Sequence, residues 1–124
     1  MNILGPVNER TSAQYTATIT DETGAVVPGS TLSAALLTFY DLKTKTIINS
    51  RNAQNVNQTN GVNISEAGVV TWVLTPADNP IVNVLSHQTQ ETHIGVFDFR
   101  WDAGASRVVH PFTVLVTDVG LVSS

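Results

Sequence analysis

Short runs of β-forming residues, broken at regular intervals by turn residues, limit the folds open to this sequence more than any other feature does. Stretches rich in Val, Ile, Thr and aromatic residues are separated by Gly, Pro, Asn and Asp at spacings of about ten residues, a pattern typical of β-sandwiches and β-barrels. The connections are too short to hold a crossover helix, which favours antiparallel pairing. The chain has 124 residues, enough for one domain with one core. The sequence therefore predicts a single all-β domain, an antiparallel β-sandwich of seven to eight strands.

The clearest strands are residues 13–20 and 32–41, where apolar side chains recur at every second position over much of each segment. Further strands are expected at residues 46–50, 62–64 and 69–75, and residues 81–86 are expected to form a helical turn or an extended crossover. The segment Thr75-Pro76-Ala77-Asp78 predicts a single helical turn, because it combines an N-cap residue, a proline at the first helical position and an acid at the third.

Residues 92–101 and 107–116 predict a hairpin whose strands carry large apolar residues on both faces. A half-buried strand in a small domain is expected to be apolar on one face only, so the second face needs a further layer, such as another protein. A five-residue loop, 102–106, would place Asp98 opposite His110. The core face would then hold Phe97, Phe99, Val109 and Leu115. The other face, predicted to contact a partner or the margin of the second sheet, would hold Ile94, Val96, Phe112, Val114 and Val116.

The chain ends and Trp101 complete the predicted interface. We expect an extended N-terminal arm at residues 1–12, the sandwich at 13–118 and a C-terminal tail at 119–124. The apolar contacts of the arm would be Ile3, Leu4 and Val7. Pro111 lacks a backbone donor, which places the last long strand at a bulge or at a sheet edge that could accept the arm of a neighbouring copy. Trp101 lies at the end of the first hairpin strand. Two roles for its side chain have equal weight: a structural role, and a role as an interface anchor or carbohydrate platform.

Composition excludes several classes of partner. Charged residues make up 13% of the chain and the net charge is -4, so no basic patch is available to neutralise phosphates, and nucleic-acid binding is not expected. The chain has no cysteine, which rules out disulfides and thiolate chemistry. Neither a signal peptide nor an apolar run of about 20 residues is present, so no membrane association is predicted.

No catalytic, cofactor-binding or metal-binding residues are predicted, and an enzyme is the least expected class. The three histidines show no ligand spacing such as H-x-x-x-H, and no nucleophile or phosphate-binding motif occurs. Asp98 with His110 is expected to be a partly exposed cross-strand pair rather than a pH switch. Trp72 lies in an alternating strand and is expected to fill the core rather than to stack on a sugar.

Several segments, spread over most of the chain, carry a resemblance to a known group of proteins. They are Tyr15-Thr16-Ala17-Thr18, Asp21-Glu22-Thr23-Gly24, Leu36-Leu37-Thr38-Phe39-Tyr40-Asp41, Thr46-Ile47-Ile48-Asn49-Ser50-Arg51-Asn52, Asn55-Val56, Asn60-Gly61-Val62, Thr71-Trp72 with Leu74, Pro76-Ala77-Asp78-Asn79 and the hairpin around Phe97 to Trp101. Together they resemble small proteins encoded among the virion genes of tailed bacteriophages. The resemblance implies an immunoglobulin-like β-sandwich with a structural role in the virion. The chain lacks the cysteine pair of antibody domains and the tyrosine before the second cysteine, so no closeness to those domains is implied.

This resemblance leads us to expect a capsid decoration or cement protein that acts by protein–protein contacts. Its partners would be the major capsid protein or other virion proteins, with self-association on the particle. The protein would be assembled into virions in the host bacterial cytoplasm and not secreted. The alternatives are a neck, tail or baseplate component, or a carbohydrate-binding adhesion module that uses Trp101; no sequence feature supports a host glycan as partner.

Overall fold

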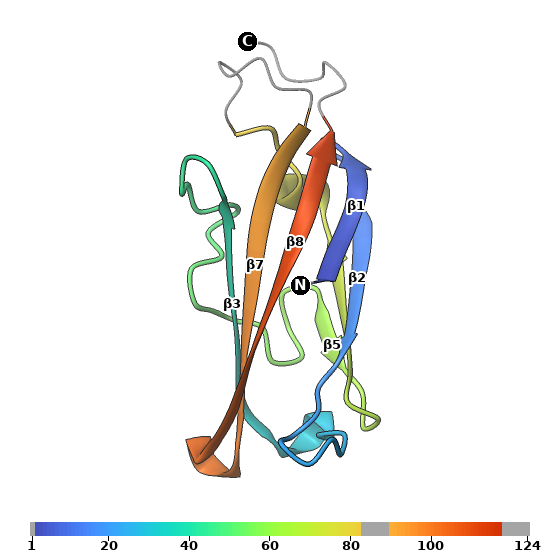
Figure 1. Cartoon of the computed structure of the whole chain (residues 1–124), viewed down its shortest axis with the longest axis vertical. Helices are drawn as coiled ribbons and strands as arrows, with labels where there is room; N and C mark the ends of the chain where they lie inside the picture. Colours follow the sequence, from blue (N-terminus) through green and yellow to red (C-terminus); the bar gives the residue numbers. More distant parts are fainter. Residues whose placement is uncertain (1, 83–89, 118–124) are drawn as a thin grey trace.

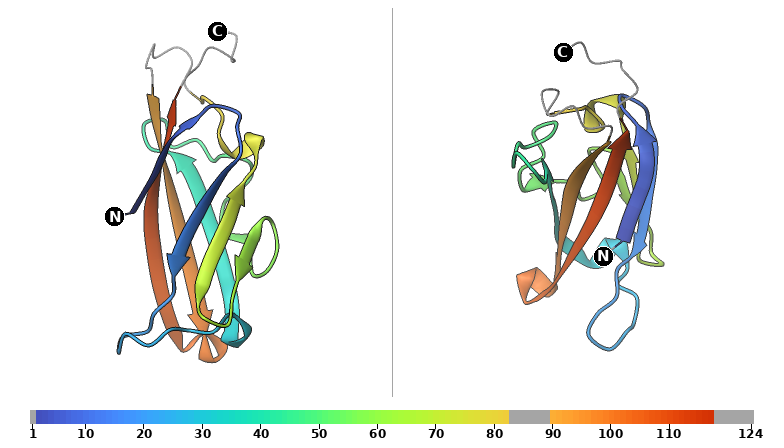
Figure 2. Two further views of the ribbon diagram at one scale, coloured as in Figure 1. Left: turned by 90° about the vertical axis from the view of Figure 1, so that its right-hand side faces the viewer. Right: turned by 45° about the horizontal axis from the view of Figure 1, so that its top comes forward.

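The structure, a computed structural model, describes residues 2–82 and 90–117. It is an all-β fold in which two sheets pack face to face (Figure 1). The two further views show the sheets as separate layers with the hairpin turn of the longest strands at one end (Figure 2). The expected tail at 119–124 and most of the expected turn at 81–86 lie outside the described residues.

The larger sheet has five strands in the order β1-β8-β7-β3-β4, and the smaller has three in the order β2-β6-β5. The strands of the larger sheet are β1 (Asn2–Asn8), β8 (Ser106–Thr117), β7 (Gln90–Trp101), β3 (Leu32–Asp41) and β4 (Gln54–Asn55). Those of the smaller sheet are β2 (Ala13–Thr18), β6 (Val69–Leu74) and β5 (Val62–Ile64). Every strand pair among them is antiparallel except β1 with β8, which is parallel. The prediction of a mostly antiparallel two-layer β fold is confirmed.

The core lies between the sheets because the inward positions of each strand are apolar. In β3, Ala35, Leu37 and Phe39 are fully buried, as the two-residue period of a strand requires. Trp72 of β6 is the largest buried side chain, and the edge of the Phe39 ring meets it at a centroid distance of 5.1 Å. The prediction that Trp72 fills the core is confirmed.

The hairpin of β7 and β8 forms where it was expected, but its register differs by one residue. Trp101 pairs with Ser106, so the loop has four residues, with a short 3-10 turn at Asp102–Gly104. A slip of one residue exchanges the two faces of a strand. Asp98 therefore pairs with Val109, and the predicted pairing of Asp98 with His110 is wrong.

Gly95 explains how the opposite strand accommodates this register. It pairs with Phe112, and a Cβ atom at Gly95 would lie 2.2 Å from Cζ of the Phe112 ring. The absence of a side chain thus creates the space in which the ring turns inward. Phe112 then stacks on Tyr15 at a centroid distance of 4.2 Å and on Phe97 at 5.3 Å.

The N-terminal segment is a strand of the chain's own sheet. β1 runs parallel to the second half of β8, with Ile3 beside Thr113 and Val7 beside Val116. The first half of β8, up to Pro111, has no described strand on that side, which agrees with the expected edge position. The sequence suggested that the N-terminal arm of a neighbouring copy could pair with the edge of β8. For residues 112–117 this is wrong, because β1 of the same chain pairs there.

The segment after β3 departs from the predicted strand at residues 46–50. Asn49 and Ser50 have positive φ values of 53° and 58°, which end the extended conformation, and only Ile47 forms an isolated bridge, with Tyr40. The predicted helical turn is confirmed as a 3-10 turn at Pro76–Asp78, closed by a capping box between Thr75 and Asp78.

A buried ion pair connects these two loops. Arg51 donates from Nε to Oδ1 of Asp78 at 2.6 Å and from a terminal nitrogen to Oδ2 at 3.1 Å. Both side chains are almost fully buried, and the guanidinium lies over the Trp72 ring at 5.1 Å. The two residues are 27 positions apart in the sequence, and the sequence pattern did not indicate that they pair.

Candidate functional site

The outward side of the five-stranded sheet carries apolar side chains from four strands. Alternation along β3, β7 and β8 places one set of apolar side chains opposite the core. We call this set the outer face; its members are Ile3, Leu36, Tyr40, Ile94, Val96, Val109 and Leu115. They lie on adjacent strands, as the side-by-side course of β3, β7, β8 and β1 in Figure 1 shows.

Strand register brings these side chains into rows across the sheet. One row runs Ile3, Thr113, Ile94 and Tyr40, and therefore crosses four strands from β1 to β3. Side chains directly opposite on neighbouring strands have Cβ atoms about 4.5–5.5 Å apart, so the members of a row are neighbours, with Thr113 between Ile3 and Ile94 in this row. The outer face is thus a surface assembled from segments at both ends of the chain.

Exposure along the outer face is graded. Ile3 at the β1 edge is 64% exposed and Val109 is 44% exposed, whereas Ile94 in the middle of the sheet is only 9% exposed. Ile94 nevertheless does not belong to the core cluster between the sheets. The exposed apolar area of this face therefore lies mainly at Ile3 and Val109.

A charged group lies on the same side of the sheet near the hairpin turn, where Asp98 stands between Leu36 and Val109. Asp98 accepts hydrogen bonds from Arg100 at 2.9 Å and from Arg107 at 2.9 Å. The hydrogen bond from Arg100 is the main cause that lowers the pKa of Asp98 below its usual value, so this carboxylate stays ionised at neutral pH. The group carries one net positive charge, and it separates Leu36 from Val109 on this side of the sheet.

Three of the nine predicted interface residues belong to the outer face. Ile3, Ile94 and Val96 are in this set. Leu4 is partly buried and packs against the core between the sheets. The remaining five, which the structure places in the core cluster, are Val7, Trp101, Phe112, Val114 and Val116.

The one-residue register difference explains the errors in β8. Because the loop has four residues and not five, Phe112, Val114 and Val116 turn inward and are fully buried. Val109 and Leu115, which were predicted to face the core, lie on the outer face for the same reason. Val7 is buried because β1 pairs with β8 of its own chain.

Trp101 does not provide an exposed aromatic platform. It is 9% exposed and belongs to the core cluster, where its strand end pairs with Ser106. A sugar-stacking tryptophan needs an open ring face, which this burial removes. Of the two roles expected for Trp101, the geometry therefore favours the structural one over that of an interface anchor or carbohydrate platform.

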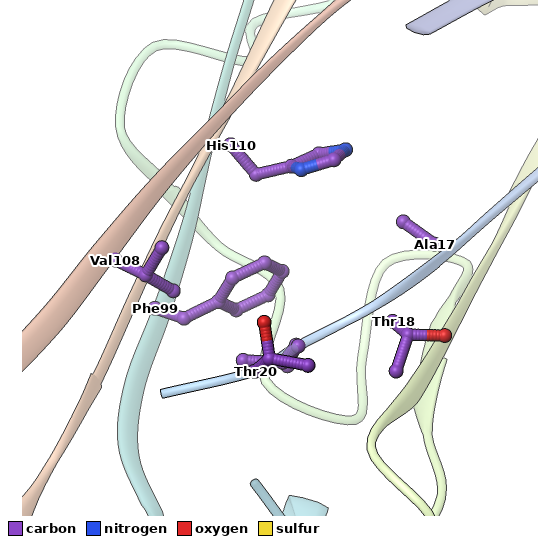
Figure 3. A pocket seen from close by; sticks show the side chains of 7 residues that line it. Ala17, Thr18, Thr20, Phe99, Val108 and His110 are labelled. Atoms are coloured by element: carbon purple, nitrogen blue, oxygen red, sulfur yellow. The ribbon is translucent and has the colours of Figure 1, made fainter. Parts of the chain in front are cut away.

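Between the sheets, a small pocket opens beside His110 (Figure 3). Its volume is about 90 Å³, far below the several hundred Å³ of a typical small-molecule site. Its lining consists of Ala17, Thr18, Ile19, Thr20, Phe99, Val108 and His110. His110 Nε2 lies 2.6 Å from the hydroxyl of Tyr15, and burial lowers the pKa of His110, so the ring is neutral at pH 7. The pair is a half-buried contact between the two sheets.

Comparison of the chain with models of protein families, with curated proteins and with solved structures finds no match. Among the residues that the structure describes, no helix is long and apolar enough to cross a membrane.

Proposed function

We propose that this protein is a structural component of a tailed-phage virion, a capsid decoration protein that attaches through its outer face. The observation that carries the proposal is the outer face itself, a set of apolar side chains from four adjacent strands on the side of the sheet that faces away from the core. Apolar side chains gathered on one outward surface are a feature of sites of protein–protein contact. The resemblance to virion proteins then supplies the class of partner, a capsid subunit.

The strand order supports the finer assignment to an immunoglobulin-like fold. In such domains one sheet contains strands C, F and G, with C′ added in the variable type, and the other contains B, E and D. Here β3, β7 and β8 correspond to C, F and G, and β4 to C′. The second sheet, β2-β6-β5, then corresponds to B, E and D in the same spatial order.

The size of the outer face fits a stable attachment. Four strands spaced by about 4.8 Å, each contributing about ten residues at 3.3 Å, cover roughly 600 Å² before side-chain relief is counted. A standard interface buries about 800 Å² on each partner. The proposed mechanism is therefore adhesion, with no chemical step.

The alternatives differ in where the protein sits and in what it binds. A neck, tail or baseplate protein would use the same face at a position of lower copy number. The carbohydrate-binding alternative depended on an exposed Trp101, and the burial of that ring leaves it without a supporting observation.

The copy number per particle tests the proposal. Quantitative mass spectrometry of purified virions of the phage that encodes this chain is expected to find copies on the order of hundreds, as a symmetric shell provides. A number matching a single ring would assign the protein to the neck or tail. Absence from purified particles would contradict a role in the virion.

A further inference from the structure

A buried cluster of two carboxylates and one imidazole lies at the end of the sandwich opposite the hairpin turn. Asp41 ends β3 and pairs with His93 of β7, and Glu91 lies two residues before His93 on the same side of that strand. The ligand atoms of these three residues all lie within 4.8 Å of one another. No other group of three such residues with this spacing occurs among the residues that the structure describes.

The His93 ring faces both carboxylates. Its Nε2 atom is 2.9 Å from Oε1 of Glu91 and 3.7 Å from Oδ1 of Asp41. Asp41, Glu91 and His93 are all at least 97% buried, and the edge of the imidazole packs against the Phe39 ring at 5.7 Å. The three side chains therefore converge on one point inside the protein.

The charge and the geometry at this point favour a cation. Two carboxylates lie close together in the protein interior, and a divalent cation would balance both of them. The Nε2 atom of His93 lies near both carboxylates and is the imidazole atom that would bind the cation.

The distances also suit direct coordination. With metal–ligand bonds of about 2.0–2.2 Å, separations of 2.9 and 3.7 Å correspond to ligand–metal–ligand angles of about 90° and about 125°, on either side of the tetrahedral value. Neighbouring groups hold the carboxylates in place: Asp41 Oδ2 accepts from Thr44, and Glu91 Oε1 accepts from the backbone N–H of Val82 at 2.8 Å.

We propose that Asp41, Glu91 and His93 bind one divalent transition-metal ion of the zinc type. One nitrogen and two oxygen ligands are the donor set that zinc accepts, whereas calcium takes six to eight oxygens. The ion joins the end of β3 to the start of β7 and, through Glu91, to the segment that contains Val82. Its role is to stabilise this end of the sandwich, independently of the attachment function proposed above.

The test uses the full-length protein, stripped of metal with a chelator and then titrated with Zn²⁺. We expect one equivalent to bind, and saturating Zn²⁺ to raise the Tm by at least about 5 °C, because an ion that binds only the folded state stabilises it. Co²⁺, used as a spectroscopic probe, should give the visible absorption of a low-symmetry site with nitrogen and oxygen ligands. Ca²⁺ at the same concentration should leave the Tm unchanged.

Variants separate this cluster from adventitious binding. His93→Gln and Glu91→Gln should each abolish the Zn²⁺ shift and the Co²⁺ absorption, whereas His110→Gln, which removes a histidine outside the cluster, should retain both. The absorption spectrum of a Co²⁺-loaded variant reports on the site even where the substitution lowers stability. Absence of binding by the native protein, or an unchanged Co²⁺ spectrum in His93→Gln, would overturn the proposal.

Discussion

Replacing Asp78 by asparagine is expected to lower the free energy of unfolding by about 3–5 kcal/mol, the usual cost of removing one partner from a buried ion pair. Asp78 is fully buried and accepts two hydrogen bonds from Arg51, at 2.6 and 3.1 Å. It also accepts from Asn49 and from the backbone N–H of Thr75. The substitution leaves the Arg51 guanidinium buried without its counter-charge and weakens the capping box. Urea denaturation of both proteins measures the loss in free energy of unfolding, provided that their m-values are equal.

The same pair predicts how stability depends on pH. Burial raises the pKa of Asp78, but hydrogen bonds from Arg51 and Asn49 lower it by more, so the pKa lies below the usual value. Because the folded-state pKa is depressed, the stabilisation is complete above the unfolded-state pKa of about 3.9 and is lost as the pH falls through the folded-state value. The Asp78→Asn variant should lack this part of the acid-induced destabilisation.

Asp98→Asn is the matched control, because Asp98 also pairs with arginine but at the surface. Its partners, Arg100 and Arg107, are 41% and 54% exposed at the side chain, and exposed pairs contribute at most about 1 kcal/mol. A loss below about 1 kcal/mol in Asp78→Asn, or equal losses in both variants, would contradict the assignment of the buried pair as a main support of the fold.

Phe112→Ala is expected to lower the free energy of unfolding by about 3–5 kcal/mol, the typical cost of truncating a buried aromatic side chain. The Phe112 ring is fully buried, stacks on Tyr15 and Phe97, and meets the Trp72 ring at a centroid distance of 5.8 Å. Truncation therefore leaves a cavity at the point where both sheets meet.

Val109→Ala is the comparison that tests the register of the hairpin. Val109 is 44% exposed on the same strand, and its truncation should change stability by no more than about 0.5 kcal/mol. Under the alternative register with a five-residue loop, Phe112 would face outward and Val109 inward, and the order of the two effects would reverse. Chemical denaturation of both variants distinguishes the two registers.

The strands and the core could be predicted to a large extent from local pattern. The strand Leu32–Asp41 and the capping box at Thr75 have short-range signals, alternation in one case and residue type in the other, and the structure agrees with both. The strand predicted at 46–50 was wrong because Asn49 and Ser50 take positive φ, which the β-forming residues before them did not indicate.

The errors in the candidate site arose from long-range pairing. The length of the loop after Trp101 decides which face of β8 is buried, and a four-residue loop cannot be told from a five-residue loop by composition. The parallel pairing of β1 with β8 joins the two ends of the chain and leaves no local signal. The Arg51–Asp78 pair and the cluster of Asp41, Glu91 and His93 likewise unite residues from separate segments.

The register also changes which residues carry the proposed attachment. The two-faced pattern of the hairpin did indicate that one side faces away from the core, and Ile94 and Val96 were placed correctly on it. The aromatic residues of the hairpin, such as Phe97, Phe99 and Phe112, belong to the core. The outer face also includes Leu36 and Val109, which the sequence pattern did not place on it.

Binding of Val109→Lys to virions that lack the native protein tests the central claim most directly. Val73→Lys is the matched control, because Val73 is 46% exposed and Val109 44%, but Val73 lies on the outward side of the three-stranded sheet. After circular dichroism has shown that both variants are folded, we expect Val109→Lys to bind particles at least about tenfold more weakly than the native protein, a loss of about 1.4 kcal/mol. Val73→Lys should bind as the native protein does. Equal binding by both variants, or a loss confined to Val73→Lys, would contradict attachment through the outer face.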